Sequence, residues 1–370
     1  MSATKLLIDT KAIEYNLRQI KKALPEGTTI MPMVKANAYG CGVEIVSEVI
    51  KDYSFAAVAD ANEALYLKQF YYNSIILIYQ PAAEEIPIIV ENEFIPGCCD
   101  YGFICRLNEA AEKVGKLIKI HLSVDTGAGR LGISLEECDE MAQKLKELKN
   151  IHVHGVFTHY ASSDSLNKED LRYTQGQTKK FEKAVNLLES VLGRIDFRHA
   201  SCSCAIFTQN SEILNMARPG YMLYGYYPSP DFSSFVDLKP SATLVTKVLY
   251  VKKASKGSSI GYNRTYTLEK DSLIATIGAG YSDGIQRHLS NKGFVVINEQ
   301  RAPIVGRVCM DITMIDVTNI KGNVSAGDAA AIFDNNIVTL DDIAKWCDTI
   351  GYEILVQIPK ERVDRVRIIS

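Results

Sequence analysis

Residues 28–42 read TTIMPMVKANAYGCG, an apolar run that ends in a lysine and passes at once into a turn of Asn, Tyr and Gly. An amphipathic pattern follows at 44–52, so the stretch has the form of a buried strand, a tight turn and a helix. Lys35 closes the strand, and a buried ammonium group is costly unless it is paired, deprotonated or chemically modified. The stretch therefore predicts both an α/β fold and a functional lysine.

The same strand–turn–helix unit recurs from residue 28 to about residue 225. We expect strands at 28–35, 54–59, 74–79, 94–98, 117–125, 151–159, 195–203 and 213–218, with helices at 10–24, 44–52, 61–70, 101–115, 135–148 and 170–193. Nearly continuous apolar strands that alternate with helices are typical of a parallel sheet. Eight such units favour closure into a barrel, and an open doubly wound sheet is the alternative.

The pattern changes after about residue 235, where short strands are separated by Gly, Asn and Lys turns and long helices vanish until 340–351. We therefore predict an α/β protein with an N-terminal (β/α)8 TIM barrel over residues 10–235. A C-terminal, mostly-β domain is expected over 236–370 together with 1–9, whose strand could pair with either domain.

Composition excludes several classes of function. The chain of 370 residues has a formal net charge of −3, which gives no basic field for nucleic acid. Its nine cysteines are scattered and form no metal-ligand framework, so we expect reduced thiols in a cytoplasmic protein. No apolar stretch has the length of a membrane span, and no secretory leader is expected.

Polar residues gather at the ends of the predicted strands, where barrel enzymes build their sites. Taken singly, a strand-end histidine is more often a core or capping residue, and a lone arginine is usually solvated. The convergence of five strand ends favours a site. The residues concerned are Lys35, Arg130, His159, His199 with Ser203, and Arg218 with Gly220 and Tyr221.

The last two strands of such a barrel usually carry a phosphate site. Ser203 offers a hydroxyl there, and the turn at Gly220 and Tyr221 can direct backbone N–H groups at an anion. A phosphate at this place, with the amine of Lys35 on the first strand, suits pyridoxal 5′-phosphate, whose aldehyde forms an imine with a lysine.

The motifs also resemble those of one family in order along the whole chain. MVKANAYGCG at 33–42 resembles the pyridoxal-phosphate signature of alanine racemases. Further matches are DTGAGRLG (125–132), FTHYASSD (157–164), HASCSCA (199–205), ARPGYMLYG (217–225), GYNRTYT (261–267), GAGYSDG (278–284) and GRVCMD (306–311). The resemblance implies a cofactor-binding barrel, a β domain and a head-to-tail homodimer with shared active sites. It also implies an enzyme that interconverts L- and D-alanine and supplies D-alanine for peptidoglycan synthesis.

The resemblance also implies roles for residues. Lys35 would hold the cofactor and act as the base on one face of the substrate's α-carbon, and Tyr262 of the partner subunit would act on the other. Inversion of a stereocentre needs a proton removed from one side and delivered to the other. His159 would hydrogen-bond that tyrosine, and Arg218, buttressed by His199, would face the pyridine nitrogen.

Other residues match binding positions of the family. Arg130 would reach the cofactor's phenolic oxygen and the substrate carboxylate. The expected phosphate ligands are Tyr39, Ser203 and the backbone of Gly220 and Tyr221. The expected contributions to the substrate pocket are Met310 and Asp311 from the partner chain, and Tyr281 at its entrance.

Some positions depart from the family. Many members carry a lysine, often carbamylated, at the position of Ser123, where it orients the arginine. Here a bound anion or Asn and Ser hydrogen bonds would have to hold Arg130. Cys202 stands for the usual asparagine, Tyr221 for an aliphatic residue, and Lys360 or Glu361 for a pocket tyrosine.

These departures leave the substrate open between alanine and serine or a broader set of amino acids. GAGYSDG at 278–284 suggests a dinucleotide-binding module as an alternative, but its spacing is not G-x-G-x-x-G and we expect no helix after it. One-domain relatives lack the β domain, and the related decarboxylases carry glycine-rich phosphate motifs that this chain lacks.

Overall fold

The computed structural model describes residues 4–209 and 211–369, and it divides the chain into two compact units. One unit consists of Ile13–Ala38 and Val46–Lys239, and the other of Met1–Ala12, Tyr39–Ile45 and Pro240–Ser370. Residues 1–3 of the expected N-terminal segment lie outside the described residues.

The first unit contains eight short parallel strands, one for each predicted unit. Their bounds are β2 Thr29–Ile30, β3 Phe55–Val58, β4 Ser74–Leu77, β5 Ile95–Cys98, β6 Ile118–Ser123, β7 Ile151–Phe157, β8 Phe197–His199 and β9 Met216–Ala217. Strands β3 to β8 pair in chain order, and β2 pairs with β9. Single bridges from Met33 to Ala57 and from Cys202 to Arg218 join the two groups. The sheet therefore closes into the expected barrel, and the open doubly wound alternative is wrong.

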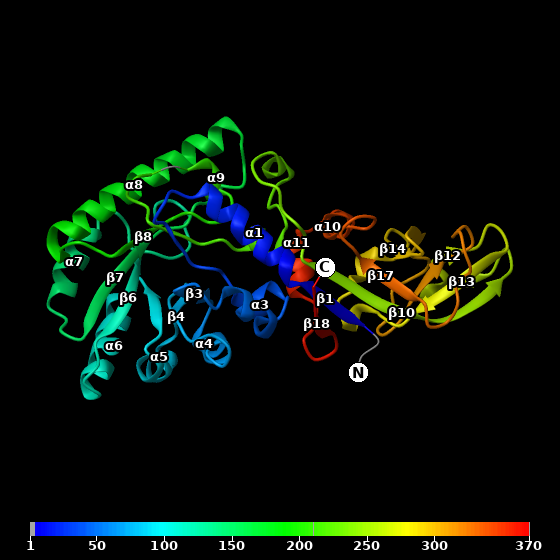
Figure 1. Cartoon of the computed structure of the whole chain (residues 1–370), viewed down its shortest axis with the longest axis horizontal. Helices are drawn as coiled ribbons and strands as arrows, with labels where there is room; N and C mark the ends of the chain where they lie inside the picture. Colours follow the sequence, from blue (N-terminus) through cyan, green and yellow to red (C-terminus); the bar gives the residue numbers. More distant parts are fainter. Residues whose placement is uncertain (1–3, 210, 370) are drawn as a thin grey trace. The chain divides into compact units, whose positions relative to one another are not determined.

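Helices follow the strands on the outside of the barrel, as Figure 1 shows for β3 to β8. Asp60 and Asp100 cap two of them by accepting hydrogen bonds from backbone N–H groups of the first turn. The helices are α1 Thr10–Ala23, α3 Val43–Ile50, α4 Ala61–Leu67, α5 Ile86–Asn92, α6 Tyr101–Lys113, α7 Cys138–Lys146, α8 Lys168–Leu192 and α9 Ala205–Thr208, with short 3₁₀ turns η1 Ala83–Glu85, η2 Tyr221–Tyr224 and η3 Pro230–Ser234. Sequence patterns did not predict α5, which is short and contains Pro87.

The predicted strand 28–35 is shorter than expected. It ends at Ile30 because Pro32 has no N–H for a ladder, and Met33 makes only one further bridge. Lys35 opens α2 (Lys35–Tyr39), whose residues Ala36 to Tyr39 have φ between 52° and 55°. This is a left-handed turn of four non-glycine residues, a conformation that costs about 1–2 kcal/mol per residue.

The second unit is mostly β and contains one mixed sheet of eight strands. Its strands and helices are β1 Lys5–Asp9, β10 Ala242–Ala254, β11 Ser259–Ile260, β12 Tyr266–Thr267, β13 Ser272–Ile277, β14 Phe294–Ile297, β15 Gln300–Pro303, β16 Thr313–Asp316, β17 Ala329–Phe333, β18 Asp364–Ile368, α10 Leu340–Cys347 and α11 Gly351–Val356, with 3₁₀ turns η4 Tyr262–Arg264, η5 Tyr281–Asp283 and η6 Arg287–Leu289. Strand β1 lies between β10 and β18, antiparallel to the first and parallel to the second.

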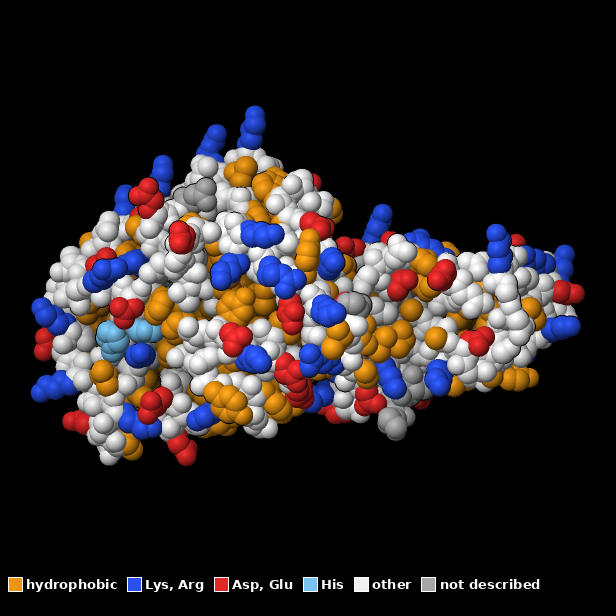
Figure 2. All heavy atoms as spheres, in the orientation of Figure 1, with side chains coloured by type: hydrophobic (Ala, Val, Ile, Leu, Met, Phe, Trp, Pro, Cys, Tyr) orange, Lys and Arg blue, Asp and Glu red, His pale blue; other side chains and the backbone are white. Residues whose placement is uncertain are grey.

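The surface carries charges of both signs, which alternate over the barrel face that Figure 2 shows. Among the described residues, no helix has both the length and the apolarity needed to cross a membrane.

Candidate active site

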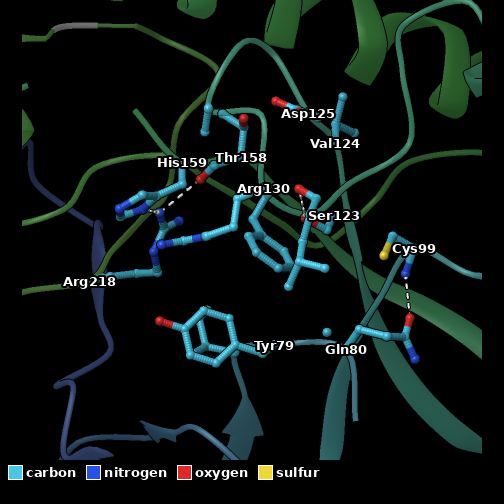
Figure 3. Close-up of a pocket in the computed structure, with 15 residues that line it drawn as sticks. Tyr79, Gln80, Cys99, Ser123, Val124, Asp125, Arg130, Thr158, His159 and Arg218 are labelled. Carbon is cyan, nitrogen blue, oxygen red and sulfur yellow. Dashed lines mark hydrogen bonds between the residues drawn. The ribbon is translucent and has the colours of Figure 1, made fainter. Parts of the chain in front are cut away.

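Five side chains from five different strand ends meet at the carboxyl end of the barrel. Lys35 follows β2, Tyr79 follows β4, Arg130 follows β6, His159 follows β7 and Arg218 follows β9. Figure 3 shows the last four around the same space, a cavity of about 30 Å³ that they line together. The convergence comes from the barrel, because these residues lie up to 183 positions apart in the chain.

The left-handed turn presents Lys35 to this site. Glu63, in the first turn of α4, accepts a hydrogen bond from the N–H of Ala36 at 2.6 Å and another from the N–H of Ala59 at 2.8 Å. One carboxylate thus ties the strained turn to the end of β3. Burial raises the pKa of Glu63 above its ordinary value, although both backbone hydrogen bonds oppose that shift.

Tyr79 contacts two cations of the site, and the sequence interpretation did not include it. Its hydroxyl oxygen lies 2.7 Å from Nζ of Lys35, and the guanidinium of Arg130 lies 5.3 Å from the centre of its ring. Burial raises the pKa of Tyr79, but the hydrogen bond from Lys35 and the charges of Lys35, Arg130 and Arg218 outweigh it and lower the pKa below 10. Tyr79 ends the predicted strand 74–79, so the rule that selected the other strand ends would have found it.

Tyr79 also bears on the missing lysine at position 123. Ser123 lines the same cavity, and its hydroxyl donates only a long hydrogen bond of 3.4 Å to the carbonyl of Leu131. The group that the structure places against Arg130 is the face of Tyr79, a cation–π contact worth about 0.5–1 kcal/mol at an exposed site.

Arg218 is a buried cation surrounded by neutral acceptors, a set that we call the neutral cage. Its two terminal nitrogens donate to the carbonyls of Thr158, His199 and Ala200 and to Nδ1 of His159 and of His199, at 2.8–3.4 Å. The side chain is 3% exposed, and among residues 4–209 and 211–369 no carboxylate pairs with it. Burial lowers the pKa of Arg218 to about 10, so the guanidinium keeps its charge at neutral pH.

His159 is held neutral beside this cation. Burial, followed by the charges of Arg218, Arg130 and Lys35, lowers the pKa of His159 to about 3. Because a guanidinium can only donate, Nδ1 of His159 must accept from Arg218, and the ring hydrogen sits on Nε2. His159 therefore offers one N–H donor, at Nε2, to a group outside this contact.

The structure brings the two expected phosphate ligands of the last strands together. The hydroxyl oxygen of Ser203 accepts a hydrogen bond of 2.9 Å from the N–H of Gly220, and Ser203 is 6% exposed. The side chain of Tyr221 is buried against Tyr226, with ring centres 5.4 Å apart. Tyr39, in the other unit, is buried with its ring centre 6.2 Å from that of Tyr352.

The remaining predicted site residues lie on turns of the β unit. Tyr262 opens the turn η4 and is 69% exposed, and Tyr281 and Met310 are exposed as well. The N–H and hydroxyl of Ser282, next to Tyr281, donate to the carbonyl of Met310 at 3.0 and 2.8 Å. Asp311 pairs with Arg362 at 2.8 Å. In place of the helix of a dinucleotide module, the short turn η5 follows β13.

The barrel residues fit pyridoxal phosphate. Lys35 supplies the amine, and Ser203 keeps its hydroxyl hydrogen for an anion, since the described residues offer that hydrogen no acceptor in a hydrogen bond. The neutral cage accepts hydrogen bonds only from the two terminal nitrogens of Arg218. Among the described residues, none accepts from its Nε–H, which is left to donate to a ligand. An arginine is one of the two partners that such enzymes use for the pyridine nitrogen.

Comparison with known proteins agrees with this fit. Sequence profiles for "Alanine racemase, N-terminal domain" and "Alanine racemase, C-terminal domain" match residues 8–228 and 241–367. The chain is 36% identical over 373 residues to alanine racemase 2 from Caldanaerobacter subterraneus subsp. tengcongensis, covering 99% of this chain and 95% of the relative.

Solved structures share the whole fold. Alanine racemase from Clostridium difficile 630 superposes with a TM-score of 0.94 at 31% identity, covering 100% of this chain and 97% of that one. A structure from Bartonella henselae, described as having covalently bound pyridoxal phosphate, superposes with a TM-score of 0.86 at 25% identity over 100% of both chains. The resemblance seen in the motifs is confirmed.

Proposed function

We propose that this chain, which belongs to the alanine racemase family, interconverts L- and D-alanine. Pyridoxal 5′-phosphate is the cofactor of this family of isomerases. A cytoplasmic location, with D-alanine passing to peptidoglycan synthesis, is part of the proposal. A serine or broad-specificity racemase of the same fold is the alternative, because Ser123 and Tyr79 alter the surroundings of Arg130.

The proposal rests on the neutral cage, which keeps Arg218 charged inside the site. When bound, the cofactor supplies a ring that withdraws electrons from the substrate's α-carbon. Arg218 can donate a hydrogen bond to the pyridine nitrogen but cannot give up its proton to it. Arg218 would therefore leave that nitrogen unprotonated, which would favour removal and return of one proton over side reactions such as transamination.

Lys35 would remove and return the proton on one face of the α-carbon. Its amine reaches the site from the left-handed turn and lies 2.7 Å from the hydroxyl of Tyr79. That hydroxyl holds the amine on the side of Arg130, which would bind the substrate carboxylate.

Tyr262 of the partner subunit would act on the opposite face. A phenol with an ordinary pKa near 10 is a weak base at neutral pH unless its anion is stabilised. The Nε2–H of His159 is a donor of the right kind, because Arg218 fixes that tautomer. Tyr262 is 69% exposed in this chain, which leaves its phenol available to a second copy in a homodimer with shared sites.

The other predicted residues take supporting roles in the proposal. The phosphate would be held by Tyr39, Ser203 and the backbone at Gly220 and Tyr221. The substrate pocket would be completed by Met310 and Asp311 from the partner chain, with Tyr281 at its entrance.

The shared site can be tested by mixing two inactive variants, Lys35→Ala and Tyr262→Phe. If subunits exchange at random, half of the dimers are mixed, and each mixed dimer has one site with both bases intact. We expect recovery of roughly a quarter of the wild-type activity. A mixture that forms mixed dimers and stays inactive would show that the two residues serve the same chain's site.

The substrate can be tested with five L-amino acids (Ala, Ser, Lys, Arg, Glu) and chiral detection of the D-product. The proposal predicts that alanine has the highest kcat/KM. A higher value for serine selects the alternative. Failure to form any D-product with the cofactor loaded refutes a racemase.

A further inference from the structure

Five of the six histidines of the chain lie on or directly after the neighbouring strands β6, β7 and β8. Three of them, which we call the histidine row, are His199 on β8, His121 on β6 and His154 on β7. Their exposed fractions are 0%, 0% and 6%. His199 supports Arg218 directly, but the proposed reaction uses neither His121 nor His154.

The histidine row is continuous from Arg218 to the surface. Nδ1 of His199 lies 2.8 Å from Arg218, and Nε2 of His199 lies 2.7 Å from Nδ1 of His121. Nε2 of His121 lies 3.3 Å from Nδ1 of His154. Nε2 of His154 in turn lies 3.9 Å from a carboxylate oxygen of the exposed Asp196. Figure 2 shows histidine side chains reaching the surface among charged groups at this part of the barrel.

Arg218 sets the direction of every hydrogen bond in the row. A guanidinium only donates, so Nδ1 of His199 must accept and its hydrogen must sit on Nε2. His121 must then accept at Nδ1 and donate from Nε2, and the same holds for His154. Nε2 of His154, which then carries the hydrogen, lies 3.9 Å from a carboxylate oxygen of Asp196, too far for a hydrogen bond. The order is therefore set by Arg218 alone.

The barrel is built around this row. Gly155 on β7 faces the ring of His121, and a Cβ at that position would lie 2.6 Å from ring atoms. The β6–β7 register also shifts between Ile120 and His121. Phe157 stacks on His199 with ring centres 5.1 Å apart and planes 8° apart. These features fix the rings of His121 and His199 in place.

All three rings are neutral at neutral pH. Burial is the largest cause in each case, and it holds the pKa of His199 and of His121 well below 6.5 and lowers the pKa of His154 to about 4. The charge of Arg218 acts in the same direction on the inner two, and that of Lys119 on the outer two. Asp196 opposes the shift at His154, while His152 adds to it.

The row is not a path for protons to the site, because its inner end is a guanidinium that does not release its proton. We propose that His121 and His154 are positioning residues that lock His199 in its Nε2–H tautomer. His199 then keeps a lone pair on Nδ1 for Arg218, and the guanidinium stays oriented toward the cofactor's pyridine nitrogen. The kinetic part of this inference rests on the proposed function, but the tautomer part does not.

The test compares two substitutions whose side chains have the same number and branching of heavy atoms, His121→Asn and His121→Leu. Asparagine can accept the Nε2–H of His199 through its amide oxygen, whereas leucine cannot. In the cofactor-free protein at pH 7.5, two-bond ¹⁵N–¹H NMR of histidine-labelled protein reports which ring nitrogen carries the hydrogen. We expect Nε2–H for His199 in the wild type and in His121→Asn. In His121→Leu the buried Nε2–H loses its acceptor, so we expect the ring to turn away from Arg218 and to show a mixture of tautomers.

Steady-state kinetics of the cofactor-bound variants then distinguish a positioning role of His121 from a role in packing alone. We expect His121→Leu to lower kcat about tenfold, the effect of one buried neutral hydrogen bond, with KM changed less than about twofold. His121→Asn should stay within about threefold, and the exposed control His288→Asn should be unchanged. Equal losses in both His121 variants would overturn the positioning role. Nδ1–H on His199 in the wild type would overturn the tautomer lock, even if leucine at position 121 does not fold.

Discussion

Unfolding of the cofactor-free protein should take up several protons from a mildly acidic solution. Four histidines in or beside the barrel core have lowered pKa values, namely His121, His154, His159 and His199. In the unfolded chain each returns to a pKa near 6.5. At pH 5.5 such a group is about 90% protonated when unfolded. Folded His154 and His159, with pKa values of about 4 and about 3, carry almost no proton at that pH.

The expected uptake is therefore about 0.9 proton per histidine and roughly 3.6 for the four. The sign follows from linkage: the unfolded state binds more protons, so the free energy of unfolding falls as the pH falls. For His154 the stabilisation is complete above about pH 7.5 and is lost progressively between pH 6.5 and pH 4, a loss of about 3 kcal/mol. With all four groups, the slope near pH 5.5 is roughly 5 kcal/mol per pH unit.

The uptake can be measured directly by pH-stat titration when urea unfolds the weakly buffered cofactor-free protein at pH 5.5. A companion run at pH 7.5 should show only about 0.4 proton from these groups. His154→Asn should take up about 0.9 proton less than the wild type at pH 5.5, whereas His288→Asn, at an exposed position, should leave the difference unchanged. Equal uptake by the two variants would refute neutral burial of His154.

Three further outcomes concern single contacts. Tyr79→Leu should raise KM for alanine about two- to fivefold because it removes the ring against Arg130, whereas Tyr79→Phe should leave KM unchanged, as steady-state kinetics can show. Ala36→Gly should raise the free energy of unfolding in urea by up to about 1 kcal/mol, since the exposed Ala36 has a φ of 52°. Gly155→Ala should lower it by about 1–3 kcal/mol, because the added methyl group meets the ring of His121.

The barrel could be predicted from sequence because its strands are buried on both faces. A run such as 74–79 is apolar throughout, and short turns connect it to helical patterns, so the parallel sheet and its carboxyl-end site follow from periodicity. The same rule located Lys35, Arg130, His159 and Arg218. The rule covers Tyr79 as well, but a tyrosine at the end of an apolar strand resembles a core residue, and the sequence interpretation did not include it.

The left-handed turn could not be predicted from the sequence because the residues of Ala36–Tyr39 do not, as a set, favour positive φ. Glycine and asparagine are the residues that normally mark this conformation, and only Asn37 belongs to them. The turn is imposed by its surroundings, including the two hydrogen bonds of Glu63 to the ends of adjoining segments. Local propensity could not show this, since Glu63 lies 27 residues away.

The histidine row was hidden for a different reason, since its members are mid-strand residues that only the barrel brings together. A buried cation must be solvated by acceptors, and a carboxylate would satisfy it while neutralising the positive charge that, in the proposed function, faces the pyridine nitrogen. Imidazole nitrogens and backbone carbonyls satisfy the same donors and leave that charge intact. An imidazole does so only in the correct tautomer, and a second and third ring can hold it in that tautomer.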